Sequence, residues 1–145
     1  MKKQMLNVVV TLSIIVTLAV AGFAALGGKL EAKVPFDFNV NGKTLPAGEY
    51  TIEPSTNGSL LMIRNWKTGQ AAASIARATK DNNDGKPQLI FRRYGQQYFL
   101  AQVISPTRVN ELMKSKAERE AARGNHLAQG GAAPEIVTIS AQLGQ

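Results

Sequence analysis

The feature that most constrains this 145-residue chain is a period-two alternation of apolar and polar residues that begins near residue 33. Within residues 33–40 every second residue is Val or Phe, so one face of the segment is apolar and the other faces water, as in a half-buried strand. The pattern returns in later segments that are separated by Asn-Gly and Pro-Ala-Gly turn sequences. It predicts a small, mainly β domain: an antiparallel β-sandwich or barrel of six to seven strands.

The alternation places individual strands along the chain. Residues 71–79 are rich in alanine and are compatible with a helix, but the regular strand spacing favours a strand. The clearest hairpin joins residues 88–94 to 98–104 through Gly95. The predicted strands cover residues 33–40, 49–53, 60–64, 71–79, 88–94, 98–104 and 135–140.

The chain divides into four predicted segments. An antiparallel β-domain at 33–110 is followed by a short charged helix at 111–124, which begins with a capping box from Ser115 to Glu118 and ends at Gly124. Residues 125–145 are expected to form a Gly/Ala-rich linker and a last strand that pairs back onto an edge of the sheet.

The remaining segment, residues 1–32, is predicted to direct export instead of joining the fold. Two lysines precede a run of 22 uncharged residues from Met5 to Leu26, which fits a secretory signal peptide or an uncleaved N-terminal membrane anchor helix. Small residues offer cleavage sites after Ala21, Ala24 and Ala32. The expected location is periplasmic or extracellular, with anchoring to the inner membrane as the alternative, and membrane contact only through this segment.

Composition limits the chemistry that the domain can carry. There is no cysteine, and the one histidine, His126, falls in the predicted linker, so neither a nucleophile–base pair nor a zinc site is expected. The loop Asp81–Gly85 has its glycine one position too early for a calcium loop. We therefore expect no enzyme, no cofactor and no metal.

The charge of the chain is only mildly basic. Of its net charge of +7, a surplus of +5 remains from residue 33 onward, since three lysines and one glutamate come earlier. These charges are dispersed, which is typical of a solvated surface. No nucleic-acid partner is expected.

Four residues are candidates for ligand binding: Trp66, Tyr94, Tyr98 and Arg92. Trp66 lies in a predicted turn, where its ring could stack on a sugar or a partner, or fold over the open end of the sheet. One arginine of the Arg92–Arg93 pair must share the inner face of its strand, so it needs a buried partner or a place at the rim of the sheet.

Several motifs in order resemble a family of small exported proteins of unknown function that is common in Acidobacteria. They are VPFDF at 34–38, GKTLPAGEYT at 42–51, RRYG at 92–95, YFL at 98–100 and KSKAERE at 114–120. The resemblance implies export and no catalytic residues. The LPAGEY segment at 45–50 is also similar to strands of transthyretin-like and carboxypeptidase-regulatory-like sandwiches.

The expected function is that of an exported non-catalytic binding or structural module of the cell envelope, whose partner is an envelope protein or a glycan. The alternative is a small-molecule or carbohydrate carrier with an aromatic-lined pocket among Trp66, Tyr94 and Tyr98.

Overall fold

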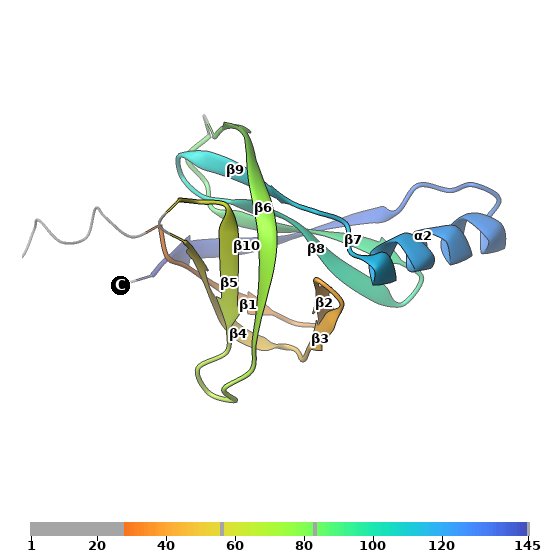
Figure 1. The fold of residues 1–145 in the computed structure, drawn as a ribbon, viewed down its shortest axis with the longest axis horizontal. Helices are drawn as coiled ribbons and strands as arrows, with labels where there is room; N and C mark the ends of the chain where they lie inside the picture. Colours follow the sequence, from red (N-terminus) through yellow and green to blue (C-terminus); the bar gives the residue numbers. More distant parts are fainter. Residues whose placement is uncertain (1–27, 56, 83, 145) are drawn as a thin grey trace, which may run out of the picture.

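The computed structural model describes residues 28–55, 57–82 and 84–144, and this part of the chain is mainly antiparallel β-structure with one helix (Figure 1). It holds ten strands, more than the six to seven predicted. The elements are β1 (Leu30–Val34), β2 (Phe38–Val40), β3 (Lys43–Leu45), β4 (Gly48–Pro54), β5 (Leu60–Arg64), β6 (Ala71–Asp81), β7 (Gln88–Tyr94), β8 (Gln97–Ile104), β9 (Arg108–Leu112), α2 (Lys116–Ala128) and β10 (Glu135–Leu143).

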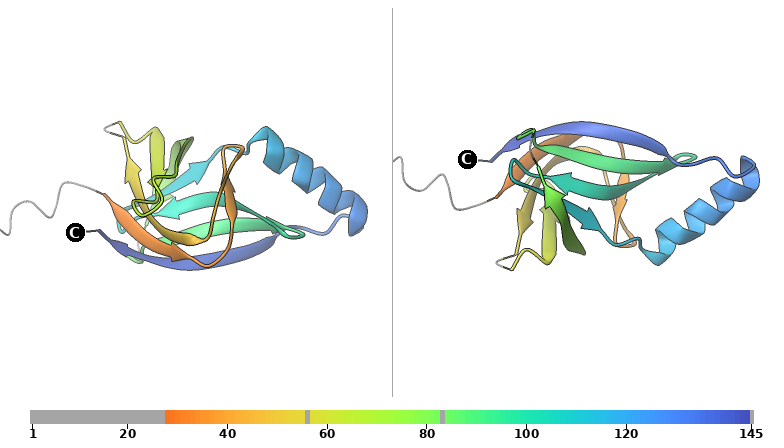
Figure 2. Two further views of the ribbon diagram at one scale, coloured as in Figure 1. Left: turned by 90° about the horizontal axis from the view of Figure 1, so that it is seen from below. Right: turned by 90° about the horizontal axis from the view of Figure 1, so that it is seen from above.

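Eight of the strands form a closed barrel. Neighbouring strands pair in the order β8, β7, β10, β1, β4, β5, β6 and β9, and the pairing of β9 with β8 completes the ring. Every pairing within this ring is antiparallel. The two further views in Figure 2 show the strands curving around one common interior. Of the two predicted architectures, the barrel is therefore the one that forms.

The predicted first strand, residues 33–40, is split into β1 and β2. The break falls after Val34, where Pro35 has no N–H to donate to a ladder. The Asn41–Gly42 turn then joins β2 to β3, with φ of 51° and 84° at its two residues, as the sequence predicted.

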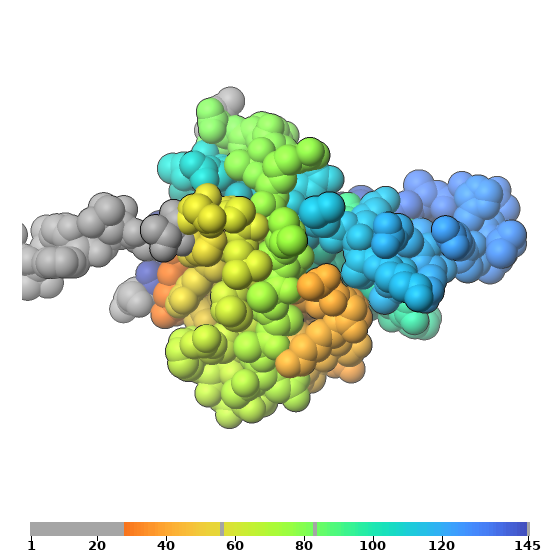
Figure 3. Space-filling model, in the orientation of Figure 1, coloured from red at the N-terminus to blue at the C-terminus, as the bar shows by residue number. Residues whose placement is uncertain are grey.

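The β2–β3 hairpin covers an edge that the barrel leaves open. The first half of β6 pairs with β5 and the second half with β9, so the first half has no strand on its other side. Lys43 Nζ donates to the Ala71 carbonyl at 2.7 Å, and Asn41 Nδ2 donates to that of Ala73 at 3.4 Å. The hairpin is seen packed against β6 in Figure 3. Side-chain donors thus replace a neighbouring strand.

Side chains fill the interior of the barrel. Phe38 from the hairpin meets the rings of Tyr50 and Phe91 edge to face, with centroid distances of 5.0 and 5.4 Å. These rings and the aliphatic residues around them are almost fully buried. The interior is therefore a packed core, as in other small barrels whose lumen holds no ligand.

The helix and the segment before it differ from their predicted bounds. Residues 108–112 form β9, which leaves the predicted helix 111–124 to begin later, at Lys116. The helix continues through Gly124 and includes His126, because a glycine without positive φ does not end a helix. It ends where Gly130 and Gly131 adopt φ of 64° and 91°.

The last strand does not pair onto an edge. β10 lies between β1 and β7, where it completes the barrel, and it runs to Leu143 instead of Ser140. The helix projects away from the barrel before the chain returns to this strand (Figures 1 and 2). The C-terminal end of β10 therefore lies beside the beginning of β1.

The β-domain begins earlier than the boundary predicted at residue 33. Leu30, Glu31 and Ala32 pair with β4 on one side and with β10 on the other. The predicted signal or anchor helix lies outside the described residues. None of the helical residues that the structure describes belongs to a helix long and apolar enough to cross a membrane.

Candidate binding surface

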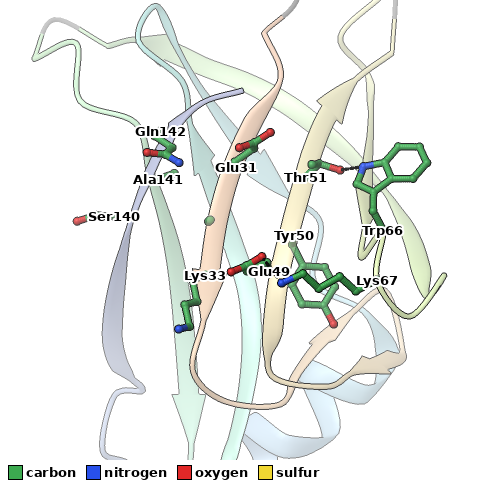
Figure 4. Close-up of a pocket in the computed structure, with 11 residues that line it drawn as sticks. Glu31, Lys33, Glu49, Tyr50, Thr51, Trp66, Lys67, Ser140, Ala141 and Gln142 are labelled. Atoms are coloured by element: carbon green, nitrogen blue, oxygen red, sulfur yellow. Dashed lines mark hydrogen bonds and ion pairs between the residues drawn. The ribbon is translucent and has the colours of Figure 1, made fainter. Parts of the chain in front are cut away.

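A groove lies on the outer face of the barrel, across β10, β1 and β4 (Figure 4). Its volume is about 550 Å³, within the range of ligand sites. The loop between β5 and β6 forms one wall, and Trp66 lies there. We call this region the Trp66 groove; its main polar residues are Glu31, Lys33, Glu49, Thr51, Lys67 and Gln142.

Strand alternation determines which side chains form the floor of the Trp66 groove. Successive side chains of β1 and β4 point to opposite faces, so the apolar residues enter the core while the polar ones face outward. The register sets Glu31 opposite Thr51 and Lys33 opposite Glu49. On the other side of β1, Glu31 is opposite Gln142 of β10. The floor is therefore a row of hydrogen-bonding groups across three adjacent strands.

A buried asparagine shapes the loop that carries Trp66. Asn65 is 3 % exposed, and its Oδ1 accepts hydrogen bonds from the backbone N–H groups of Lys67 at 3.0 Å and Thr68 at 3.2 Å. Gly69 closes the turn by donating to the Asn65 carbonyl at 2.8 Å, with φ of 74°. Hydrogen bonds to Asn65 thus hold the conformation of the loop that carries Trp66.

Trp66 is held in place and yet exposed. Its Nε1 donates to Thr51 Oγ1 at 2.9 Å, and the Arg64 guanidinium lies 4.6 Å from the ring centroid. The residue nevertheless remains 62 % exposed. The sequence left stacking and packing open for this ring. It contacts the outer face of β4 and does not fold over an end of the barrel.

The lining of the Trp66 groove carries two carboxylates, Glu31 and Glu49, and two ammonium groups, Lys33 and Lys67. Lys67 Nζ lies 2.8 Å from Glu49 Oε2, and Lys29 Nζ lies 3.6 Å from Glu31 Oε1. The hydrogen bond from Lys67, followed by the charge of that lysine, lowers the pKa of Glu49. The surface therefore presents both signs of charge without a strong excess of either.

Arg92 and Tyr94, two of the predicted site residues, lie elsewhere, beneath α2. Arg92 Nε donates to Glu118 Oε1 at 2.5 Å, and Tyr94 Oη donates to the same oxygen at 3.3 Å. Burial, and after it the charge of Glu118, raises the pKa of Tyr94. The arginine that shares the inner face of β7 with Leu89 and Phe91 is Arg93, and it takes the place at the rim: its side chain is 30 % exposed and lies 3.1 Å from Glu135. Arg92 points to the outer face, where α2 covers it. The cluster of Arg92, Tyr94 and Glu118 attaches the helix to β7.

This cluster changes one detail of the predicted capping box. Ser115 Oγ accepts from the Glu118 N–H at 3.1 Å, as expected for an N-cap. The Glu118 carboxylate, however, turns to Arg92 and Tyr94 instead of reaching back to the N-cap.

Tyr98, the fourth predicted residue, lies on the opposite face of the β7–β8 hairpin from Tyr94. Its ring stacks on Phe36 with a centroid distance of 3.8 Å, and the Arg93 guanidinium lies 5.4 Å from its centroid. The four predicted residues therefore occupy three separate places, and the Trp66 groove contains neither tyrosine.

Sequence reasoning missed the partners of Trp66. Thr51, Arg64 and Lys67 were read only as parts of strands and turns, although they hold the ring or border the groove. The signal that could have found them is the β4–β5 pairing, which sets Thr51 opposite Arg64. In the part of the chain that the structure describes, no group of three or more His, Asp or Glu residues could hold a metal ion.

The fold and this surface define the class of the protein as a small, mainly antiparallel β-barrel with a polar groove on its outer wall. Comparisons with protein-family models, with curated proteins and with solved structures find no match to the chain.

Proposed function

We propose that this protein is an exported, non-catalytic binding module of the cell envelope, and that the Trp66 groove is its contact surface. One observation carries the proposal: a tryptophan that is 62 % exposed is fixed by a hydrogen bond to Thr51 beside a groove of about 550 Å³. A large aromatic ring in water has no folding role that requires this exposure, but it supplies much contact area to a partner.

The fixed position of the ring favours binding. A side chain that is free in solution loses rotamer entropy when a partner immobilises it, at about 0.5–1.5 kcal/mol for each such side chain. The bond to Thr51 and the contact with Arg64 restrict Trp66 beforehand. This part of the entropic cost is therefore already met in the free protein.

The packed interior disfavours the alternative of a carrier that encloses its ligand. Leu45, Phe91 and Tyr50 fill the barrel and are almost completely buried. At one end of the barrel, Leu30, Ile52 and Asn110 are among the residues around a cavity of only about 130 Å³. That volume is below the range of about 300–1,000 Å³ for small-molecule sites.

The electrostatics of the groove fit binding better than acid–base catalysis. A general acid at neutral pH needs a carboxyl whose pKa is raised. Lys67 instead lowers the pKa of Glu49, one of the two carboxylates that line the groove. Glu118, the one buried carboxylate among the described residues, is engaged by Arg92 and Tyr94 beneath the helix.

The test compares the wild-type protein with Trp66→Ala in binding to fractionated envelope material: insoluble wall polysaccharide, membrane vesicles and soluble proteins. We expect one fraction to retain the wild type and to lose most of this retention in the variant. Leu127→Ala is the matched control, since Leu127 is also an exposed apolar residue but lies on α2, away from the groove. Equal retention of all three proteins would refute the assignment of the surface.

A further inference from the structure

We infer that the ligand of the Trp66 groove is an uncharged polysaccharide chain, with one sugar ring stacked on Trp66 and its hydroxyls bonded to the floor of the groove. This inference rests on the proposed function and specifies the chemical class of the ligand. Three properties of the surface carry it: the presented face of the indole, the balance of charge, and the density of polar groups on three neighbouring strands.

The Arg64 guanidinium lies over one face of the indole, 4.6 Å from the ring centroid, and the exposed ring offers its other face to a ligand. Its one polar atom, Nε1, is already engaged with Thr51, so no N–H of the ring remains to select a ligand. A ligand at Trp66 must therefore make apolar contact with a flat ring. The C–H face of a sugar ring provides such contact, while its hydroxyls point outward from the rim to reach polar neighbours.

The charge balance argues against a strongly charged ligand. Glu49 is paired with Lys67, and Glu31 with Lys29, so each acidic group has a lysine at 2.8 or 3.6 Å. An anionic chain would meet the two carboxylates, and a cationic chain would meet the lysines. The lining carries two carboxylates, Glu31 and Glu49, and two ammonium groups, Lys33 and Lys67, so a chain of one charge sign meets as much like charge as opposite charge. A neutral chain can accept from the ammonium groups and donate to the carboxylates.

The floor matches a ligand with many hydroxyls. It offers the amide of Gln142 on β10, the carboxylate of Glu31 and the ammonium of Lys33 on β1, and the carboxylate of Glu49 on β4 (Figure 4). Adjacent strands are about 4.8 Å apart, so donors and acceptors recur across the groove at roughly the spacing of one strand. A polyol chain can satisfy such an array along its length, but an aliphatic or aromatic ligand would leave it unpaired.

The chain contains a built-in reporter for this inference. Trp66 is its one tryptophan, so intrinsic indole fluorescence reports on this surface alone. We would titrate the protein with the neutral oligosaccharides cellohexaose, maltohexaose and hexa-N-acetylchitohexaose, and with the anionic hexagalacturonate as a charged comparator. We expect one neutral oligosaccharide to change the emission with saturation and to protect the ring from acrylamide quenching.

Variants and salt then test the mode of binding by calorimetry. Trp66→Ala should weaken the neutral ligand at least about tenfold, as loss of a central aromatic contact does, while Trp66→Phe should retain part of the affinity. Raising the salt from about 50 mM to about 500 mM should change the affinity less than about twofold, because little net charge is paired on binding. Leu127→Ala should bind like the wild type.

The outcomes separate this inference from the function on which it rests. Tighter binding of hexagalacturonate that fades with salt would overturn the neutral class. If no oligosaccharide binds but a soluble envelope protein is retained only when Trp66 is present, the ligand is a protein and the inference fails while the binding function stands. If no envelope fraction distinguishes Trp66→Ala from the wild type, both fail.

Discussion

Replacing Glu118 should release α2 from the barrel, because this carboxylate is the polar anchor of the helix. The residue is 2 % exposed, and its side chain accepts hydrogen bonds from Arg92 and Tyr94. In Glu118→Ala, the Arg92 guanidinium loses its partner while its side chain is only 14 % exposed. An uncompensated charge at such a site is strongly destabilising.

The expected size follows from the burial of the pair. Breaking a buried ion pair by removing one partner costs about 3–5 kcal/mol, and we expect the lower end, near 3 kcal/mol, because Arg92 retains some contact with water. Glu118→Gln keeps an acceptor for Arg92 and Tyr94 but leaves the Arg92 charge uncompensated, so it should cost about 2 kcal/mol, less than Glu118→Ala. Replacing both charges with Arg92→Met and Glu118→Leu should restore stability to within about 1 kcal/mol of the wild type.

Urea unfolding of these proteins, analysed as a double-mutant cycle, measures the coupling directly, and amide hydrogen exchange over residues 116–128 shows whether the helix opens by itself. We expect a coupling of at least about 2 kcal/mol. Glu120→Ala is the matched control: its ion pair with Lys116 spans 3.9 Å on the surface of the same helix, so its loss should cost less than about 0.5 kcal/mol. Additive effects of the Arg92 and Glu118 substitutions would refute the reasoning.

Three further predictions concern the barrel itself. Leu30→Ala should lower the free energy of unfolding in urea by about 2–5 kcal/mol, since Leu30 is 1 % exposed. Because residues 30–32 belong to β1, the intact mass of the mature protein should show processing upstream of Leu30 and not after Ala32. A fully stable chain that begins at Lys33 would contradict this. Deleting residues 135–145 should abolish cooperative unfolding, because β1 and β7 lose the strand between them, and a synthetic β10 peptide should restore it. Burial raises the pKa of Tyr50 and Tyr94 above the ordinary value of about 10, so the unfolded chain loses these protons at a lower pH than the folded protein. The free energy of unfolding should therefore hold below pH 10 and fall above it. Tyr50→Phe and Tyr94→Phe should flatten this decline when unfolding is measured against pH.

The features that sequence could predict are those fixed by near neighbours in the chain. The Asn41–Gly42 turn and the hairpin around Gly95 depend on residues that tolerate positive φ, and both form as expected. The alanine-rich segment was also correctly assigned to a strand, β6. Closure of the barrel depends instead on β10, which pairs with residues more than a hundred positions earlier in β1. No local pattern encodes that choice, so the sequence predicts only a last strand at an edge of the sheet.

The candidate surface depends on strand register, and for that reason Trp66 could be singled out while its environment could not. Both strands of the β4–β5 hairpin were predicted, but the length of the connecting turn left their alignment open. In the structure Thr51 pairs with Arg64, which brings Trp66, two residues further on, alongside the Thr51 hydroxyl. A slip of one residue would turn Thr51 toward the core and leave the indole without its acceptor. The fixed, exposed ring is therefore a property of the β4–β5 register and not of a tryptophan in a turn.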